Sequence, residues 1–292
     1  MILIADSGST KCDWSLIDEN GKRLGDFRTM GLNPYFHDAE TTETALRANP
    51  DLMLISHKIQ QVYFYGAGSS TPEMCAIMHD GISRVFNNAH IVVDHDQLGS
   101  AMSVYDGEPC IACILGTGSN SCHFDGQKVY EEIPSLAYIL GDEASGSYFG
   151  KILLREYFYK HLPQDLAIDF ENEYKATKND IINNIYRKPN ANVYLASFMT
   201  FIGKHKDHPH MMKMVKAGMI HFIEIHVKCF PMWRTVPVHF VGSIGDVFRP
   251  CLEEACGESA VRLGKVIRKP IDGLIDYHLK YVLPHSKVNV TK

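Results

Sequence analysis

Apolar and polar positions along this chain alternate in short runs that predict strands, and these runs form two similar series. In the first series, runs bounded by Gly, Asn and Asp predict strands near residues 1–5, 12–18, 23–28, 61–68 and 91–94. Asn20-Gly21, between two of these runs, is the signal of a two-residue hairpin. Segments with helical spacing follow the third, fourth and fifth strands, so the first series predicts an α/β unit.

The second series begins after Asp106-Gly107 and repeats the same order of elements. It predicts strands at residues 110–116, 121–125, 128–133, 237–245 and 261–267. A run of helices from about 143 to 230 interrupts it, and a closing helix is predicted over about 270–283. We therefore expect two domains, 1–108 and 109–292, with the helical insertion in the second and a closing helix that packs back on the first.

Each series carries a similar motif at the turn after its first strand. Ser7-Gly8-Ser9-Thr10-Lys11-Cys12 aligns with Thr117-Gly118-Ser119-Asn120-Ser121-Cys122. Glycine lets a backbone approach an anion closely, while N–H groups and hydroxyls donate hydrogen bonds to it. One copy alone is also typical of an ordinary hairpin. Its repetition, with Lys11 as a nearby cation, predicts a clamp for the phosphates of a nucleotide.

The composition limits the classes of function. A chain of 292 residues, 45% of them hydrophobic, can build two sizeable cores. The formal net charge of −5, without any basic block, argues against nucleic acid or a membrane surface as partner. The N-terminal residues lack a signal-peptide pattern, and no apolar run approaches the roughly 18 residues of a membrane span. We therefore expect a cytoplasmic protein.

The cysteines and histidines do not predict a metal centre. Cys110 and Cys113 lie in a predicted strand, where residues three apart face opposite sides. The eight cysteines are expected to be reduced thiols. His208-Pro209 is typical of a helix start. His221 and His226 are five residues apart and do not share the face that a helical metal pair uses.

Carboxylates at predicted strand ends are the candidates for chemistry. No GxxxxGK[ST] motif is present, which sets P-loop kinases aside. Asp6 ends the first strand and could hold Mg²⁺ through water, or serve the turn. Asp96 follows the fifth strand and precedes a helix, where open α/β sheets bind ligands. Phosphoryl transfer to an alcohol needs a base. Asp96 is the candidate for this base and Asp94 is the second choice. The alternative for Asp96 is a helix cap or a solvated loop carboxylate.

Three other positions offer groups for ligands. Asp142 precedes a predicted helix and is either its N-cap or a ligand of an acceptor hydroxyl. Asn33 has a donor and an acceptor suited to a sugar hydroxyl or amide, although Asn before Pro is typical of turns. Gly242-Ser243-Ile244-Gly245 is a third glycine turn, which permits the close approach of an adenosine.

Five motifs, in this order, resemble those of the N-acetylglucosamine kinase and BadF/BcrA-type ATPase family, within the actin-like ATPase superfamily. DSGSTKCDW resembles the first phosphate motif, GTGSNS the second, DQLGSA the DAAGS-like stretch that carries the base, GDEASGS the GDEGSA-like connector and VGSIG the adenosine motif. The resemblance covers nearly the whole chain. It implies two actin-like ATPase (ribonuclease H-like) domains, each a mixed five-stranded sheet with flanking helices, facing across a nucleotide and substrate cleft.

The resemblance also implies a reaction and a role for each candidate residue. The reaction is phosphorylation of an amino sugar by ATP and Mg²⁺, N-acetylglucosamine to its 6-phosphate above all, with domain closure to exclude water. A homodimer is implied by analogy. Asp96 would be the general base, Asp6 would organise Mg²⁺, and Asn33, Asn120 and Asp142 would contact the sugar. Gly242 and Ser243 would line the adenosine end. The phosphates would be held by Gly8, Ser9, Thr10, Lys11, Gly116, Thr117, Gly118 and Ser119.

Two alternatives stay open. One is an ATPase of the same family that activates a 2-hydroxyacyl-CoA dehydratase through a [4Fe–4S] cluster shared by two subunits. Such a protein needs cysteines that converge at a dimer axis and a GGQD-like motif. This sequence lacks the motif. The other is a nucleotide-switched binding protein without an acceptor substrate, whose ADP release would respond to no sugar. The motif departs from the family pattern at Gln97-Leu98, where small residues usually follow the base, and this bears on which sugar is bound.

Overall fold

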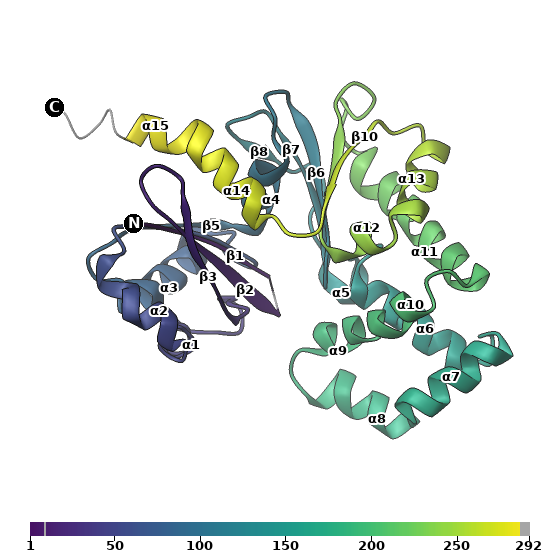
Figure 1. The fold of residues 1–292 in the computed structure, drawn as a ribbon. Coiled ribbons are helices and arrows are strands. Elements are labelled where there is room, and N and C mark those ends of the chain that lie inside the picture. Colours follow the sequence, from purple (N-terminus) through teal and green to yellow (C-terminus); the bar gives the residue numbers. More distant parts are fainter. Residues whose placement is uncertain (9, 287–292) are drawn as a thin grey trace. The chain divides into compact units, whose positions relative to one another are not determined.

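The computed structural model describes residues 1–8 and 10–286, and the chain divides into two compact units (Figure 1). Unit 1 comprises Met1–Pro109, Phe124–Val129 and the C-terminal segment that begins at Lys269. Unit 2 comprises Cys110–His123 and Tyr130–Arg268. Unit 1 is therefore built from segments that are far apart in the sequence.

Unit 1 contains a mixed five-stranded sheet with the order β3-β2-β1-β4-β5 (Figure 1). Its strands are β1 (Ile2–Ser7), β2 (Lys11–Ile17), β3 (Arg23–Met30), β4 (Gln61–Gly66) and β5 (His90–His95). β1 pairs antiparallel with β2 and parallel with β4, and β4 pairs parallel with β5. The carboxyl ends of β1, β4 and β5 therefore meet at one edge of the sheet, where ligands of α/β proteins bind.

Helices cover both faces of this sheet, which is why β1 is apolar on both sides. Leu3 and Ala5 belong to one core, and Ile2 and Ile4 belong to the other. The first core includes residues of α1 (Ala39–Arg47), α2 (Pro50–Ile55) and α3 (Pro72–Ser83). The second includes residues of α4 (Asp96–Val104), α14 (Ile271–Tyr277), the π-helical turn His278–Val282 and α15 (Leu283–Ser286). A 3₁₀ turn, Ser56–Lys58, follows α2.

The C-terminal helix is closely fitted to unit 1. Gly273 permits α14 to cross α4, because a Cβ at this position would lie 2.0 Å from the carbonyl oxygen of Ser103. The side chain of His278 is fully buried, and the hydroxyl of Tyr65 lies 2.9 Å from its Nε2. Burial lowers the pKa of His278 to about 4. The imidazole is therefore neutral in the folded protein at pH 7.

Unit 2 contains a second five-stranded sheet, with the order β10-β9-β6-β7-β8. Its strands are β6 (Cys110–Leu115), β7 (Ser119–Phe124), β8 (Val129–Tyr130), β9 (Val238–Val241) and β10 (Leu263–Ile267). β9 pairs parallel with both β6 and β10. One hydrophobic core joins Ile111 and Phe240 of the sheet to Phe149, Phe201 and other residues of the helices.

Helices fill most of unit 2 between β8 and β9 and continue after β9. They are α5 (Ala137–Leu140), α6 (Gly146–Phe158), α7 (Gln164–Tyr174), α8 (Lys178–Ile182), α9 (Ala191–Ser197), α10 (Met199–Lys204), α11 (Pro209–Phe222), α12 (Ser243–Val247) and α13 (Arg249–Glu258). π-Helical turns, Asn183–Arg187 and Ile223–Val227, follow α8 and α11. The second of these turns adjoins the candidate site described below.

The predicted pair of mixed five-stranded sheets with flanking helices is confirmed. The predicted two-residue hairpin is wrong: the N–H of Asp18 bonds to the carbonyl of Lys22, which leaves a three-residue turn with Gly21 at a φ of +85°. All eight cysteines lie in the described residues and carry free thiols. Within residues 1–8 and 10–286, no helix is both long and apolar enough to span a membrane.

Candidate active site

The first glycine turn joins β1 to β2 at the carboxyl edge of the unit 1 sheet. The N–H of Gly8 donates to the carbonyl of Lys11 at 3.0 Å and closes the turn. Gly8, Thr10 and Lys11 are exposed, so the turn presents its polar groups to solvent. Ser9, which was also predicted to bind phosphate, lies outside the described residues.

Asp6 interacts electrostatically with two other carboxylates near this turn. It lies directly opposite Asp13 in the antiparallel pair of β1 and β2. Burial, followed by the charges of Asp96 and Asp13, raises the pKa of Asp6 to about 7, and the charge of Lys11 opposes this shift. A cation bound at Asp6 would stabilise its charged form.

Asp96 is the first residue of α4 and follows β5 directly. The cap of α4 is His95, whose Nδ1 accepts the N–H of Leu98 at 3.2 Å, so the helix-cap alternative for Asp96 is wrong. The first turn of a helix stabilises a negative charge, which is the form that a general base requires. Asp94 has local partners: it accepts the N–H of His95 at 2.8 Å and lies 3.5 Å from its Nε2.

The loop that carries Asn33 is attached to the end of β1. The Oγ of Ser7 donates to the carbonyl of Leu32 at 3.1 Å and accepts its N–H at 2.9 Å. The buried Asn33 accepts the N–H of Tyr35 with its Oδ1 at 2.9 Å, which is the turn interaction expected of Asn before Pro. Its side-chain NH₂ remains as the group that can donate to a ligand. Gly68 leaves room for Asn33, because a Cβ there would lie 2.4 Å from Oδ1.

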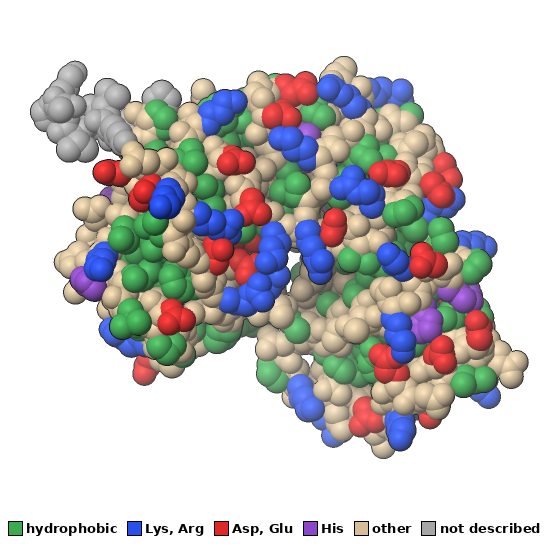
Figure 2. All heavy atoms as spheres, viewed as in Figure 1, with side chains coloured by type: hydrophobic (Ala, Val, Ile, Leu, Met, Phe, Trp, Pro, Cys, Tyr) green, Lys and Arg blue, Asp and Glu red, His purple; other side chains and the backbone are tan. Residues whose placement is uncertain are grey.

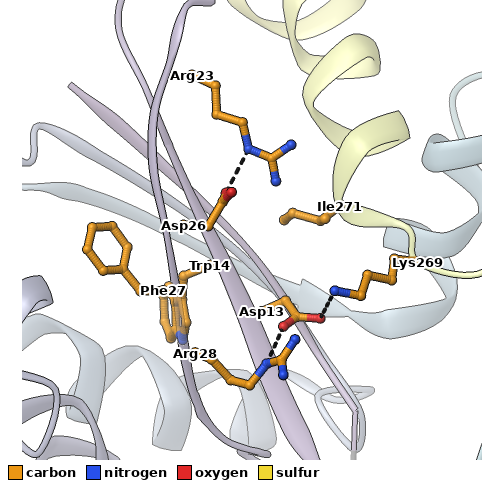
Figure 3. Close-up of a pocket in the computed structure, with 8 residues that line it drawn as sticks. All are labelled: Asp13, Trp14, Arg23, Asp26, Phe27, Arg28, Lys269 and Ile271. Atoms are coloured by element: carbon orange, nitrogen blue, oxygen red, sulfur yellow. Dashed lines mark hydrogen bonds and ion pairs between the residues drawn. The ribbon is translucent and has the colours of Figure 1, made fainter.

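Charged side chains of both signs are interspersed on the face shown in Figure 2. In unit 1, Arg23 contacts Asp26 at 2.7 Å and Asp272 at 2.6 Å. Arg23 and Asp26 belong to a polar surface pocket of about 260 Å³, which is bordered by β2, β3 and the start of α14 (Figure 3). The cations of this pocket therefore already have acidic partners.

Asp13 was not predicted as a site residue, yet three cations converge on it. Figure 3 shows two of them, Arg28 and Lys269. Its Oδ1 accepts the Nε–H of Arg28 at 2.8 Å, and its Oδ2 lies 3.6 Å from Nζ of Lys11 and 3.8 Å from Nζ of Lys269. Burial disfavours the charged form, but the bond from Arg28 and the charges of Lys11 and Lys269 outweigh burial and lower the pKa of Asp13. Its place opposite Asp6, two residues beyond Lys11, is the sequence signal that could have identified it.

The groups around Asp6 fit a magnesium ion that is shared with a nucleotide. Mg²⁺ prefers oxygen ligands and is usually bound by one or two carboxylates together with phosphates and waters. Burial, followed by the charges of Asp96 and Asp13, raises the pKa of Asp6, and a divalent cation would favour its charged form against both effects. No three His, Cys, Asp or Glu side chains of the described ranges, 1–8 and 10–286, form a ready metal site.

The second glycine turn joins β6 to β7 and is held by the start of α6. The N–H groups of Gly146 and Ser147 donate to the carbonyls of Gly116 and Thr117 at 2.8 and 3.0 Å. Gly118 lies against the predicted sugar ligand Asp142, because a Cβ at Gly118 would be 2.9 Å from Oδ2 of Asp142. The predicted phosphate turn and this carboxylate are therefore in direct contact within unit 2.

Asp142 faces the second turn and does not cap the helix that follows it. Its Oδ1 accepts the N–H of Ser119 at 3.3 Å, whereas the N-cap of α6 is Ser145, which accepts the N–H of Tyr148. The N-cap alternative for Asp142 is therefore wrong. Burial raises the pKa of Asp142, while the bond from Ser119 and the charge of Lys151 oppose this shift.

The other candidates of unit 2 lie at neighbouring strand ends. Gly242 follows β9, which runs parallel to β6, and it has a φ of +125°. A Cβ here would be 2.2 Å from the carbonyl oxygen of Leu115, so the position requires glycine. Ser243, the next residue, is exposed. Asn120 is on β7, directly after Ser119 of the second turn, and its Oδ1 accepts the N–H of Ser121 at 2.8 Å.

Glu143 and His226 form a buried pair that was not predicted. The Nε2–H of His226 donates to Oε2 of Glu143 at 2.7 Å, and the two side chains are 7% and 13% exposed, respectively. Burial disfavours the charge of Glu143, but the bond from His226 outweighs burial and lowers the pKa of Glu143. The two residues are 83 positions apart in the sequence, so no local pattern connects them.

The sequence matches no family model, and no curated protein has a significantly similar sequence. Similarity is clear among solved structures. A Porphyromonas gingivalis protein, provisionally named an N-acetylglucosamine kinase, is 39% identical and has a TM-score of 0.91, covering 96% of this chain and 99% of that one. A Chromobacterium violaceum protein with the same provisional name is 15% identical, with a TM-score of 0.67 and coverage of 96% and 98%.

A glucokinase of the ROK family from Streptomyces griseus, in complex with glucose and AMPPNP, shares the fold at 14% identity. Its TM-score is 0.56, and the match covers 94% of this chain and 97% of that one. The two five-stranded sheets and the match to the P. gingivalis protein define an actin-like ATPase. The sequence identity and coverage of the P. gingivalis match are high enough to assign the chain to a family within this class. It belongs to the N-acetylglucosamine kinase-type family of ATP-dependent sugar kinases, and the resemblance noted in the sequence is confirmed.

Proposed function

We propose that this protein transfers the γ-phosphoryl group of ATP to the 6-hydroxyl of an N-acetylhexosamine, with N-acetylglucosamine as the first choice and Asp96 as the general base. The observation that carries the proposal is the place of Asp96 in the first turn of α4, with its charge acting on Asp6 beside the first glycine turn. Phosphoryl transfer to an alcohol needs one group that accepts the hydroxyl proton and another that holds the metal. Asp96 and Asp6 suit these roles.

The nucleotide is assigned to the glycine turns. Backbone N–H groups of such turns stabilise phosphate oxygens, and Lys11 adds a positive charge next to the first turn. Asp6 would hold Mg²⁺, which neutralises charge on the transferred phosphoryl group. We assign the phosphates to Gly8, Ser9, Thr10, Lys11, Gly116, Thr117, Gly118 and Ser119, and the adenosine end to Gly242 and Ser243. The AMPPNP bound by the S. griseus glucokinase supports ATP as the donor.

The sugar is assigned to Asn33, Asn120 and Asp142. The NH₂ of Asn33 can donate to a sugar oxygen, and the carboxylate of Asp142 can accept from sugar hydroxyls. Asp142 is buried and touches the second turn, so its position is well defined. The provisional name of the P. gingivalis relative supports N-acetylglucosamine as the acceptor.

An ADP-release assay with MgATP tests this proposal. N-acetylglucosamine, glucosamine, N-acetylmannosamine, N-acetylmuramic acid and glucose are offered in turn. We expect the highest kcat/KM with N-acetylglucosamine, and mass spectrometry and ³¹P NMR should identify the 6-phosphate. 6-Deoxy-N-acetylglucosamine should inhibit without being phosphorylated, because it lacks the acceptor hydroxyl.

Other outcomes would overturn the proposal in distinct ways. ADP release that responds to none of the sugars would favour a nucleotide-switched binding protein. A sample that contains iron and absorbs visible light would favour the dehydratase activator. Turnover of glucose that equals turnover of N-acetylglucosamine would remove the assignment of an N-acetyl sugar while leaving the kinase assignment in place.

A further inference from the structure

We propose that His226 is a positioning residue of this kinase, which holds Asp142 against the second glycine turn by way of Glu143. The inference rests on the proposed function, because it takes Asp142 as a ligand of the sugar and Ser119 as part of the phosphate turn. His226 is at a π-helical turn that follows α11, and turns of this kind are frequent at functional sites. Its own contacts show how it would act.

A closed series of hydrogen bonds connects His226 to the turn. The Oγ of Ser119 donates to the carbonyl of Glu143 at 2.7 Å, and the side chain of Glu143 accepts from the ring of His226 at 2.7 Å. The carbonyl of His226 accepts the Oγ–H of Ser121 at 2.6 Å. Ser119 and Ser121 are two residues apart on β7, so they lie on the same face of that strand. The series therefore begins and ends on one strand and fixes the main chain of Glu143 relative to it.

The members of this network are shielded from water. Ser119, Ser121 and His226 are buried, and the ring of His226 stacks on Phe222 with its centroid at 4.8 Å. The Nδ1 of His226 is buried without a hydrogen-bond partner among the described residues. The bond to Glu143 is therefore the polar contact that sets the orientation of the ring. Buried hydrogen bonds of this kind hold geometry more strictly than exposed ones.

The backbone between Asp142 and α6 needs such support. Asp142 and Ala144 have φ values of +60° and +57°, a region that non-glycine residues adopt at an energetic cost. Strained conformations persist when the surrounding contacts impose them. Here Asp142 is held by the N–H of Ser119, and Glu143, between the two strained residues, is held through its carbonyl by Ser119 and through its side chain by His226.

A second histidine provides a matched control. His210 of α11 also bonds through Nε2 to a glutamate, Oε2 of Glu156, at 2.7 Å. Glu156 belongs to α6 and has no place in the network around the glycine turn. Loss of the His210 bond removes a His–Glu contact of the same length from the same unit. A general effect of losing such a pair would therefore appear in both substitutions.

The test compares steady-state kinetics of His226→Leu, His226→Gln and His210→Leu with the unsubstituted enzyme. His226→Leu fills the space without a donor, and we expect the KM for sugar and for ATP to rise by about tenfold or more. The amide nitrogen of Gln can occupy the place of Nε2, so His226→Gln should stay within about threefold. His210→Leu should leave both KM values within about twofold. KM does not depend on the fraction of folded enzyme, so mere instability would lower the apparent kcat instead.

Each outcome decides the proposal. Equal KM values in His226→Leu and His210→Leu would overturn it, as would a failure of Gln to restore KM. If His226→Leu does not fold, His226→Asn replaces it, because the shorter amide does not reach Glu143 and should raise both KM values. The affinity for AMPPNP, measured by calorimetry, should fall in the same variants. If the unsubstituted enzyme phosphorylates no sugar, the proposed function fails, and this nucleotide affinity still tests the role of His226.

Discussion

The carboxylate of Asp96 acts on that of Asp6 and contributes to raising the pKa of Asp6 to about 7. β4 lies between β1, which carries Asp6, and β5, which leads directly into Asp96 at the start of α4. Two interacting carboxylates can have different roles in phosphoryl transfer, since one can bind the metal while the other accepts a proton. The first two predictions test this division of roles.

Substitution Asp96→Asn should abolish the proton acceptor while keeping the shape of the side chain. We expect kcat to fall by about 10²- to 10⁴-fold, which is the usual contribution of a general base, with KM values changed by less than about threefold. Asp94→Asn serves as the matched control, because Asp94 is engaged with His95. A loss of kcat in Asp94→Asn that equals the loss in Asp96→Asn would contradict the assignment of the base.

Substitution Asp6→Asn should separate activity from stability. The Mg²⁺ concentration for half-maximal activity should rise by about tenfold or more, because a carboxylate ligand is lost. The melting temperature at pH 8 should rise, since burial and two neighbouring acids disfavour the charge of Asp6 in the folded state. Magnesium titrations of ADP release and thermal unfolding measure the two effects. A lower melting temperature with an unchanged magnesium requirement would show that Asp6 is structural.

Substitution Gly242→Ala should damage the nucleotide site. The new Cβ would lie 2.2 Å from the carbonyl of Leu115, at a φ of +125° that side chains rarely adopt. We expect the KM for ATP to rise by about tenfold or more and the unfolding free energy to fall by about 1–3 kcal/mol. Gly257→Ala is the control, because nothing lies within 4 Å of its added Cβ. If the Gly242→Ala enzyme were as active and as stable as Gly257→Ala, the close contact between residue 242 and the carbonyl of Leu115 would be refuted.

The pH dependence of stability should reveal the burial of His278. Its folded pKa of about 4 is below the ordinary value of 6.5, so the unfolded state binds more protons between these values. The stability that this group provides is lost as the pH falls from about 6.5 to 4, by roughly 3 kcal/mol. Asp6 acts in the opposite direction, because its raised pKa makes the folded state bind more protons as the pH falls below 7.

The difference between His278→Gln and the parent protein therefore isolates the effect of His278. Urea unfolding is followed by the fluorescence of Trp14, which is buried in unit 1, in a Trp233→Phe background that removes the signal of unit 2. We expect the parent to lose stability relative to His278→Gln between pH 6.5 and 4. Parallel pH curves for the two proteins would show that folding does not lower the pKa of His278.

The strands and the polar residues at their ends could be predicted from the sequence, because both follow local patterns. Alternation of apolar positions identified the strands, and the carboxyl ends of neighbouring strands gather polar residues such as Asp6 and Asp96 at one edge. The length of the first hairpin was predicted wrongly, because pairing shifts between Leu16 and Ile17 and Gly21 adopts a positive φ in a three-residue turn. Register of this kind depends on the neighbouring strand and not on the turn sequence alone.

The partners of Asp13 and His226 could not be predicted from local patterns. Asp13 is contacted by Arg28 on the neighbouring strand and by Lys269 from the other end of the chain. His226 contacts Glu143, 83 residues away. The sequence placed His226 and His221 on different faces, and the structure agrees, with one buried and the other exposed. The sequence could not predict the tertiary contact with Glu143, on which the proposed role of His226 depends.

The C-terminal helix has a consequence for how the protein is made. Ile2, Ile4, Tyr63 and Tyr65 share a core with residues of α14, which is translated only after the segments of unit 2. Domains usually fold as units during synthesis, with the N-terminal one first. Here the sheet of unit 1, whose strands are translated first, must wait with one face incompletely covered until α14 has been translated. A nascent chain stalled before Lys269 would thus be a natural client for chaperones, whereas unit 2 could finish folding without the missing segment.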